Sequence, residues 1–256
     1  MVSECVWLMA FKRSLRFFLF INILFIAKVF AGPPFRTDDP IPVSFMHGEL
    51  YLFSTGVFDG SGKSGIGPAL EFNYGIFQNT QFHIVVPFAY SIPKNAPSHT
   101  GYGDTEIGVK YRIVDQSDVM PDIATFPLVE IPTGNASENL GNGKPQIYLP
   151  IWLQKDICKW TIYGGGGYWI NPGIGNKNWE FEGVLVQYNF TDDFFVGAEL
   201  FHQTSSSIYS NDNTGLHLGC GIPLVNNYQI LLSSDVGNGF TSYKHFSYYL
   251  GLYHTF

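Results

Sequence analysis

Hydrophobic residues recur at every second position through much of this 256-residue chain. Residues 80–90 show the pattern, with one parity occupied by Phe82, Ile84, Val86, Phe88 and Tyr90. A period of two places side chains on one face of a β-strand, whereas a helix needs a period near 3.6. No segment after residue 31 shows a sustained helical period. The chain is therefore predicted to be an all-β protein.

Segments of this kind predict about twelve strands, near residues 46–56, 65–75, 80–90, 104–114, 122–131, 145–155, 159–170, 180–190, 194–204, 214–222, 227–237 and 245–256. Apolar residues occupy both parities in the first, fifth, seventh and eighth segments, so the faces of these four stay ambiguous. The glycine run 164–167 in the seventh segment predicts a sharply coiled strand in the wall of the fold.

The connections between these segments alternate in length along the chain. Short turns are predicted at residues 77–79, 115–121, 157–158, 191–193 and 223–226. Longer polar loops are predicted between them at residues 59–64, 91–103, 132–144, 171–178, 205–213 and 237–243. Short turns on one side and long loops on the other are typical of up-and-down transmembrane barrels, whose short turns are periplasmic.

The alternative is a soluble β-sandwich or lipocalin-like barrel, and the distribution of polar residues argues against it. Charged residues make up only 14% of the chain and aromatic residues 17%. The opposite face of residues 104–113 carries paired charges and glycine, with few of the lysines that a solvent-facing surface would show. The prediction is therefore a transmembrane antiparallel up-and-down β-barrel of about 12 strands, with a polar interior.

The one long apolar run lies at residues 17–27, after Lys12, Arg13 and Arg16. It is too short to span a bilayer as a helix, which takes about 20 residues, because Lys28 interrupts it. Residues 1–31 are predicted to be a signal peptide that is cleaved after Ala31.

Residues 32–45 are predicted to form a periplasmic or lumen-entering segment ahead of a barrel over 46–256. Four prolines keep this segment out of both helices and sheets. The chain after residue 31 keeps 10 basic and 20 acidic residues, so it is not expected to bind nucleic acid. The spacing of its two cysteines, Cys158 and Cys220, neither requires nor excludes a disulfide.

Two stretches, GPPFRTDDPIPV at 32–43 and GYGDTEIGVKYRI at 101–113, resemble outer-membrane proteins grouped with the MetA pathway of phenol degradation. The pattern G-x-G-D-x-x-x-G-x-K-Y-R is matched at Gly101, Gly103, Asp104, Gly108, Lys110, Tyr111 and Arg112. The resemblance covers most of the chain after the signal, including the terminal Phe256. It implies a channel in the bacterial outer membrane for small, often hydrophobic compounds, for uptake or efflux, without catalysis.

The strand at 104–113 places four charged residues on one face, and they must point inward because lipid would exclude them. The candidates for lining the lumen are Glu71, Asp104, Glu106, Lys110, Arg112 and Glu199. These residues are expected to pair across strands or across the lumen, narrowing a passage and setting its charge preference. The alternative is a buried ionic network that fixes strand register and has no role in transport.

Passage of a small molecule, including hydrophobic or aromatic ones, is the predicted function, and no enzyme activity, cofactor or metal is expected. The expected partners are outer-membrane lipid, a small solute, and the barrel-assembly machinery through the last strand ending in Phe256. One alternative is an outer-membrane lipid hydrolase, because His202 shares a strand face near a rim with Thr204 and Ser206. Another is a structural or adhesive barrel that acts through its long loops.

Overall fold

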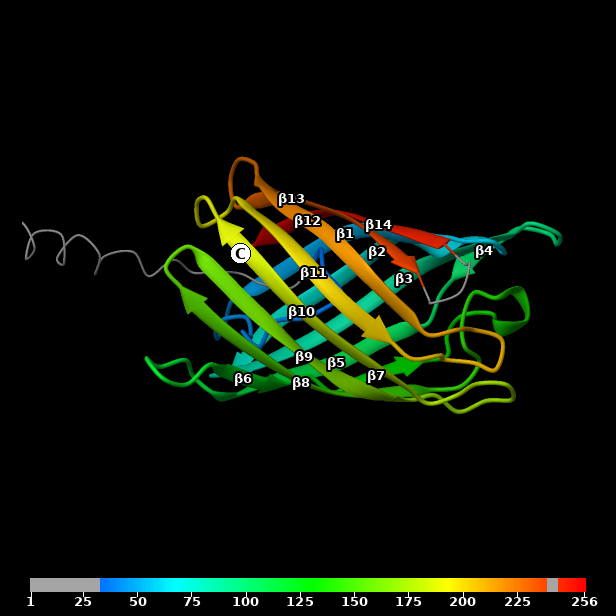
Figure 1. Ribbon diagram of the computed structural model, residues 1–256, viewed down its shortest axis with the longest axis horizontal. Helices are drawn as coiled ribbons and strands as arrows, with labels where there is room; N and C mark the ends of the chain where they lie inside the picture. Colours follow the sequence, from blue (N-terminus) through cyan, green and yellow to red (C-terminus); the bar gives the residue numbers. More distant parts are fainter. Residues whose placement is uncertain (1–32, 239–243) are drawn as a thin grey trace, which may run out of the picture.

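The computed structural model describes residues 33–238 and 244–256 and shows one closed antiparallel β-barrel (Figure 1). The signal peptide predicted for residues 1–31 lies outside the described residues. The strands are β1 (Gly48–Phe58), β2 (Gly62–Phe77), β3 (Thr80–Pro93), β4 (His99–Tyr102), β5 (Thr105–Val114), β6 (Asp122–Thr125), β7 (Leu128–Ile131), β8 (Gln146–Ile157), β9 (Trp160–Ile170), β10 (Trp179–Asn189), β11 (Phe195–Gln203), β12 (Asn213–Pro223), β13 (Tyr228–Asn238) and β14 (Lys244–Thr255). A 3-10 turn over Ala136–Glu138 lies in the loop between β7 and β8.

These fourteen segments form a barrel of twelve strands, because two of the strands are interrupted. β4 and β5 both pair with β3 and are two parts of one interrupted strand, and β6 and β7 stand in the same way between β5 and β8. Pro127 lies at the second interruption, where its missing N–H cannot extend the hydrogen-bond ladder. The prediction of about 12 strands in an up-and-down barrel is confirmed.

The barrel closes through β1 and β14, which pair antiparallel from Glu49 opposite Thr255 to Phe58 opposite Phe246. Backbone hydrogen bonds between Gly48 and Phe256 extend this pairing to the end of the chain, at 2.8 and 3.0 Å. Closure removes the free sheet edges that an open sheet would expose, which lipid does not tolerate.

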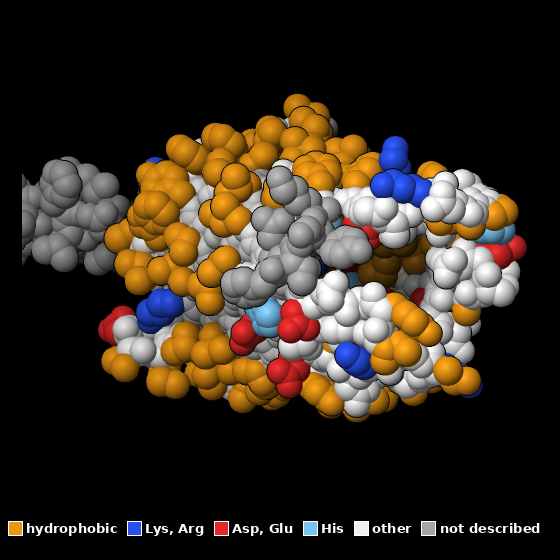
Figure 2. Space-filling view, turned by 45° about the vertical axis from the view of Figure 1, so that its right-hand side comes forward, with side chains coloured by type: hydrophobic (Ala, Val, Ile, Leu, Met, Phe, Trp, Pro, Cys, Tyr) orange, Lys and Arg blue, Asp and Glu red, His pale blue; other side chains and the backbone are white. Residues whose placement is uncertain are grey.

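The two faces of the wall have inverted polarity relative to a soluble protein. Buried polar side chains on the inner face include Gln81, His83, Lys110, Gln154, Gln187, Glu199, His217 and Asp235. Exposed apolar side chains on the outer face include Leu70, Val109, Leu149, Val184, Leu200, Leu218 and Leu250. Figure 2 shows apolar side chains spread over the barrel wall, as expected for a surface that contacts acyl chains.

Most of the described connections have the predicted alternation; the loop predicted at 237–243 lies largely outside the described residues. Short turns gather at one end of the barrel, here called the short-turn end, where the β1–β14 pairing also places the C-terminus (Figure 1). The longer loops gather at the opposite end, the long-loop end. β2 begins at Gly62, so this strand is longer than predicted and takes up part of the loop expected at 59–64. No helix of the described residues is long and apolar enough to cross a membrane.

The glycine run 164–167 does lie within one strand, β9, but its glycines have a packing role that the sequence did not show. A Cβ on Gly167 would lie 2.6 Å from the ring of Tyr148. A Cβ on Gly165, whose φ is +152°, would lie 2.9 Å from the ring of Trp152. The missing side chains therefore let aromatic rings of β8 lie flat against β9. Cys158 and Cys220 are both free.

Cysteine scanning from residue 104 to 113 tests the assignment of the two faces. Val109→Cys and Tyr111→Cys are expected to react with a membrane-soluble label, because these positions are 40% and 49% exposed on the outer face. Lys110→Cys and Arg112→Cys should be shielded from that label, since a basic residue facing lipid costs about 2–4 kcal/mol at the bilayer midplane. Labelling with the opposite parity would show that the register is wrong.

Candidate functional site: an aromatic and acidic cavity beside a lumen segment

Residues 33–45, here called the lumen segment, lie inside the barrel and contact its wall on two sides. On one side, the buried Glu199 of β11 accepts three hydrogen bonds from this segment. The backbone N–H of Arg36 donates to it at 3.1 Å, and the N–H and hydroxyl of Thr37 donate at 2.6 and 2.5 Å. His217 of β12 contacts the same carboxylate at 2.8 Å. Glu199 is therefore the anchor of the segment on this wall.

The side chain of Arg36 makes a second set of contacts farther round the same wall. Its guanidinium group lies 2.9 Å from the carboxylate of Asp235 and 3.3 Å from the hydroxyl of Ser247. It also lies over the ring of Phe201, at 4.5 Å from the ring centroid. A charge-assisted pair with a buried carboxylate is among the stronger interactions available inside a protein.

Glycines of the wall make room for the segment. The ring of Phe35 lies where side chains at Gly197 and Gly219 would stand, since Cβ atoms there would come within 2.7 and 2.8 Å of it. Thr37 lies against Gly183, where a Cβ would come within 2.0 Å of the threonine hydroxyl. The inner wall of β10, β11 and β12 is therefore complementary in shape to this segment.

On the opposite wall, Lys110 of β5 holds the segment through two consecutive aspartates. Its ammonium group lies 3.0 Å from Asp38 and 3.4 Å from Asp39. Farther along, the N–H of Val43 donates to the Gln81 side chain at 2.8 Å. Burial raises the pKa of the Asp39 carboxyl well above its ordinary range, while the Lys110 ammonium opposes that rise. The segment thus bridges the lumen from β11–β13 to β3 and β5.

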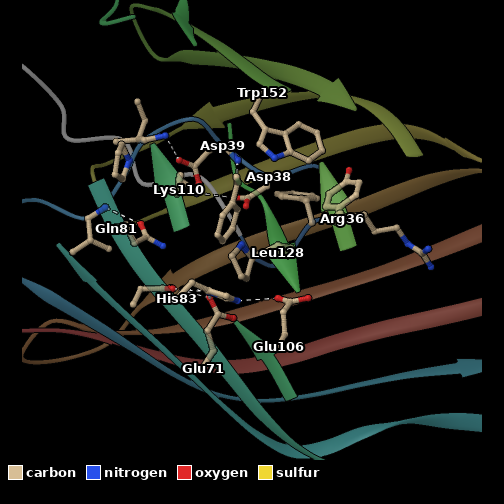
Figure 3. Close-up of a pocket in the computed structure, with 18 of the residues that line it drawn as sticks. Arg36, Asp38, Asp39, Glu71, Gln81, His83, Glu106, Lys110, Leu128 and Trp152 are labelled. Atoms are coloured by element: carbon tan, nitrogen blue, oxygen red, sulfur yellow. Dashed lines mark hydrogen bonds and ion pairs between the residues drawn. The ribbon is translucent and has the colours of Figure 1, made fainter. Parts of the chain in front are cut away.

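A cavity of about 580 Å³ lies beside the lumen segment and is lined by strand and segment residues together. Figure 2 shows an opening at the long-loop end with apolar and acidic side chains inside. Figure 3 shows Trp152, Asp38 and Leu128 on one part of its lining and Glu71, His83 and Glu106 on another. The volume lies within the range of about 300–1,000 Å³ that is usual for small-molecule sites.

Of the six residues predicted from the sequence to line the lumen, four line this cavity: Glu71, Glu106, Lys110 and Arg112. Glu106 lies 2.8 Å from Nε2 of His83, and Glu71 lies 3.6 Å from Nδ1 of the same ring. Arg112 contacts Asp115 and Asp122 at 2.8 and 3.4 Å. Glu106 therefore shares the His83 ring with Glu71, while Arg112 pairs with two aspartates.

The other two predicted residues do not line this cavity and instead bind backbone segments. Asp104 accepts hydrogen bonds from the N–H groups of Gly134 and Asn142, at 2.9 and 2.6 Å, and so fixes the loop between β7 and β8. Glu199 was expected to reach the charges of β5 across the lumen, and it instead binds the lumen segment. Sequence reasoning did not find the aromatic lining or His83, although the inward parity of β3 could have indicated the histidine.

The residues of the hydrolase alternative are not arranged as a triad. Nδ1 of His202 lies 2.7 Å from the hydroxyl of Thr214, a residue of the neighbouring strand. Thr204 accepts a hydrogen bond from the N–H of Glu180, and Asp212 accepts one from Ser205. Glu182 lies opposite His202 in the pairing of β10 with β11, but among the residues that the structure describes no ion pair joins His202 to a carboxylate. No cluster of three ligating side chains among them could hold a metal ion.

No family model matches the chain, and no curated protein matches it in sequence. Solved structures do match it. An outer membrane channel from Pseudomonas putida F1 is 14% identical and aligns with a TM-score of 0.69, over 89% of this chain and all of that one. The KdgM porin is 11% identical with a TM-score of 0.54, over 80% of this chain and 99% of that one. The translocator domain of the autotransporter NalP from Neisseria meningitidis is 10% identical with a TM-score of 0.53, over 82% and 88%.

At these identities the likeness concerns the fold. Together with the closed wall and its apolar outer face, it defines the chain as a β-barrel of the bacterial outer membrane. Two of the three similar structures are a channel and a porin.

Replacing the anchor of the lumen segment is expected to loosen the segment. Glu199→Ala leaves buried donors of Arg36 and Thr37 without an acceptor, at a cost of about 1–3 kcal/mol for each unsatisfied group. An Ile41→Cys reporter, in a chain whose native cysteines are changed to serine, should then react several-fold faster with a water-soluble maleimide.

The matched control is Glu182→Ala, because Glu182 is exposed on the outer face of the neighbouring strand. Equal reactivity of the Ile41→Cys reporter in the Glu199→Ala and Glu182→Ala backgrounds would show that Glu199 does not hold the segment.

Proposed function

We propose that this protein is an outer-membrane channel for small solutes, which pass through the barrel lumen beside the lumen segment. The observation that carries the proposal is the cavity of about 580 Å³ inside the barrel, lined by both charged and aromatic side chains. Twelve strands enclose a lumen between the packed interior of eight-stranded barrels and the open channel of sixteen-stranded porins. A structural barrel would have no need for an interior cavity of this kind.

The finer identity of the channel belongs to the same proposal. The resemblance of residues 32–43 and 101–113 to proteins grouped with the MetA pathway of phenol degradation supports a solute that is small and hydrophobic or aromatic. The indole and phenyl rings along the cavity support the same class of solute, because they bury flat apolar surface well. We also propose that the lumen segment is the element that narrows the passage.

The C-terminal strand is the proposed signal for the barrel-assembly machinery. β14 ends beside the exposed ring of Phe256, which stacks on Phe72 of β2 at a centroid distance of 6.5 Å. β14 closes the barrel by pairing with β1, so the barrel is complete only when these two strands have paired.

Deleting residues 33–45 tests the passage and the role of the segment together. The first strand begins at Gly48, so the shortened barrel should still insert into a planar bilayer. Its single-channel conductance is expected to exceed that of the full chain by about twofold or more, because the segment fills part of the lumen. Barrels that insert and conduct nothing, with or without the segment, would contradict the proposed function.

Charge reversal at Lys110 separates a transport role from a purely structural one. Lys110→Glu would place a third acid beside Asp38 and Asp39, so the ratio of cation to anion permeability should rise by about twofold or more. The control is Lys63→Glu, which changes the same charge at an exposed position of β2. A fall in thermal stability with unchanged selectivity would support the ionic network that only fixes register.

A further inference from the structure

Three aromatic rings stack across neighbouring strands at the long-loop end of the cavity, and we call them the aromatic ladder. Trp179 of β10 lies opposite Trp169 of β9, which in turn lies opposite Tyr148 of β8. The ring centroids are 5.2 and 4.6 Å apart, and the planes are inclined by 10° and 13°. Gly167 lets the Tyr148 ring lie flat on the wall. All three residues belong to the cavity lining.

Two polar atoms in and below the ladder have no hydrogen-bond partner within the described part of the chain. The Tyr148 hydroxyl and the indole N–H of Trp152 are both buried, in side chains that are 6% and 2% exposed. A buried polar group without a partner is costly, and in a native protein it calls for an explanation, such as a partner that the protein itself does not supply. The tyrosine oxygen can accept a hydrogen bond from a ligand, and the indole N–H can donate a hydrogen bond to a ligand oxygen.

Acidic side chains outnumber basic side chains around the cavity. Seven carboxylic side chains and four basic ones, His83 among them, line it, among the residues described. Each basic side chain already has an acidic partner: Lys110 contacts Asp38 and Asp39, His83 contacts Glu71 and Glu106, Arg112 contacts Asp122, and Arg36 contacts Asp235. Glu49 is bound by tyrosine hydroxyls, which add no charge. A further positive charge in the cavity would therefore be favoured electrostatically.

The protein already combines cations, carboxylates and aromatic rings elsewhere in this lumen. Lys110 lies 5.0 Å from the centroid of Phe126 while it binds its two aspartates. Arg36 lies over Phe201 while it binds Asp235. The cation–π contacts among the described residues do not include the aromatic ladder. Its indole faces are of the kind that attracts a cation most strongly.

We propose that the aromatic ladder and the cavity below it form a binding subsite for small organic ammonium ions that carry a flat ring with a hydroxyl group. The ligand ring stacks on Trp179, the partly exposed end of the ladder, because both faces of Trp169 are covered by its two neighbours. The ammonium group lies among the carboxylates that outnumber the basic side chains, and the buried Trp152 N–H donates to the ligand hydroxyl. The subsite deepens the proposed function and rests on solutes entering this lumen.

Three probes of the same ring and similar size isolate the charge: tyramine as the cation, 4-ethylphenol as the neutral analogue and 4-hydroxyphenylacetate as the anion. Their affinities for the full-length barrel in detergent are measured by isothermal titration calorimetry, with protein-free micelles as the blank. Tyramine is expected to bind about tenfold more tightly than 4-ethylphenol, and the anion more weakly than either. Equal binding of tyramine and 4-ethylphenol, or tighter binding of the anion, would overturn the proposal.

Trp169→Leu keeps an apolar side chain but removes the central ring of the ladder. It should weaken tyramine binding by about fivefold or more and change 4-ethylphenol binding less. The control is Trp160→Leu, because Trp160 is 48% exposed on the outer wall and should leave both affinities unchanged. Where Trp169→Leu does not fold, Trp179→Leu at the partly exposed end of the ladder takes its place. An unchanged tyramine affinity in the folded ladder variant would refute the subsite.

The failure of this inference is distinguishable from failure of the proposed function. Conductance in a planar bilayer with no preference for tyramine in calorimetry would leave a channel and overturn the subsite. A barrel without conductance that still binds tyramine selectively would support the subsite and overturn passage.

Discussion

Backbone hydrogen bonding within a closed sheet is the constraint on which the rest of this structure depends. In a bilayer, an unpaired N–H or C=O group costs several kcal/mol, so the wall has to pair with itself all the way round. The pairing of β1 with β14 meets this requirement. Closure fixes the alternation of side chains, and the alternation then places every second residue of each strand in the interior. The alternation of residues along each strand therefore determines which side chains line the lumen, whatever contacts they then make there.

The inward parity carries many polar groups, and a twelve-stranded interior cannot hydrate them all freely. The structure pairs them locally, as in the contacts of His83 with Glu71 and Glu106. The lumen segment pairs more of them across the barrel, because its backbone donors bind Glu199 and its aspartates bind Lys110. The wall therefore holds the segment in place, and the segment supplies partners to buried polar groups of the wall. Inward glycines on neighbouring strands make this fit sterically allowed.

The sequence predicted those features that repeat along the chain. Period two predicted the strands, the alternation of short turns and long loops predicted the topology, and the charges of residues 104–113 predicted the inner face. The partners within the lumen could not be predicted, because Glu199 and Arg36 are 163 positions apart and only closure brings them together. The aromatic ladder was not predicted for the same reason, since Tyr148, Trp169 and Trp179 lie on three different strands. The glycine run was visible, but its role depends on rings that belong to a different strand.

The positions of glycine and aromatic residues on β8 to β12 divide the inner wall into two surfaces with different uses. On β10 to β12, Gly183, Gly197 and Gly219 are covered by the protein's own lumen segment. On β9, Gly165 and Gly167 are covered by the Trp152 and Tyr148 rings of the wall, and both rings belong to the cavity lining. The first surface binds a segment of the same chain, and the second lines the cavity in which we propose that a solute binds. Because Glu199 and Asp235, which hold the segment on this wall, are not among the residues that line the cavity, a solute in the cavity would bind next to the segment without displacing it from them.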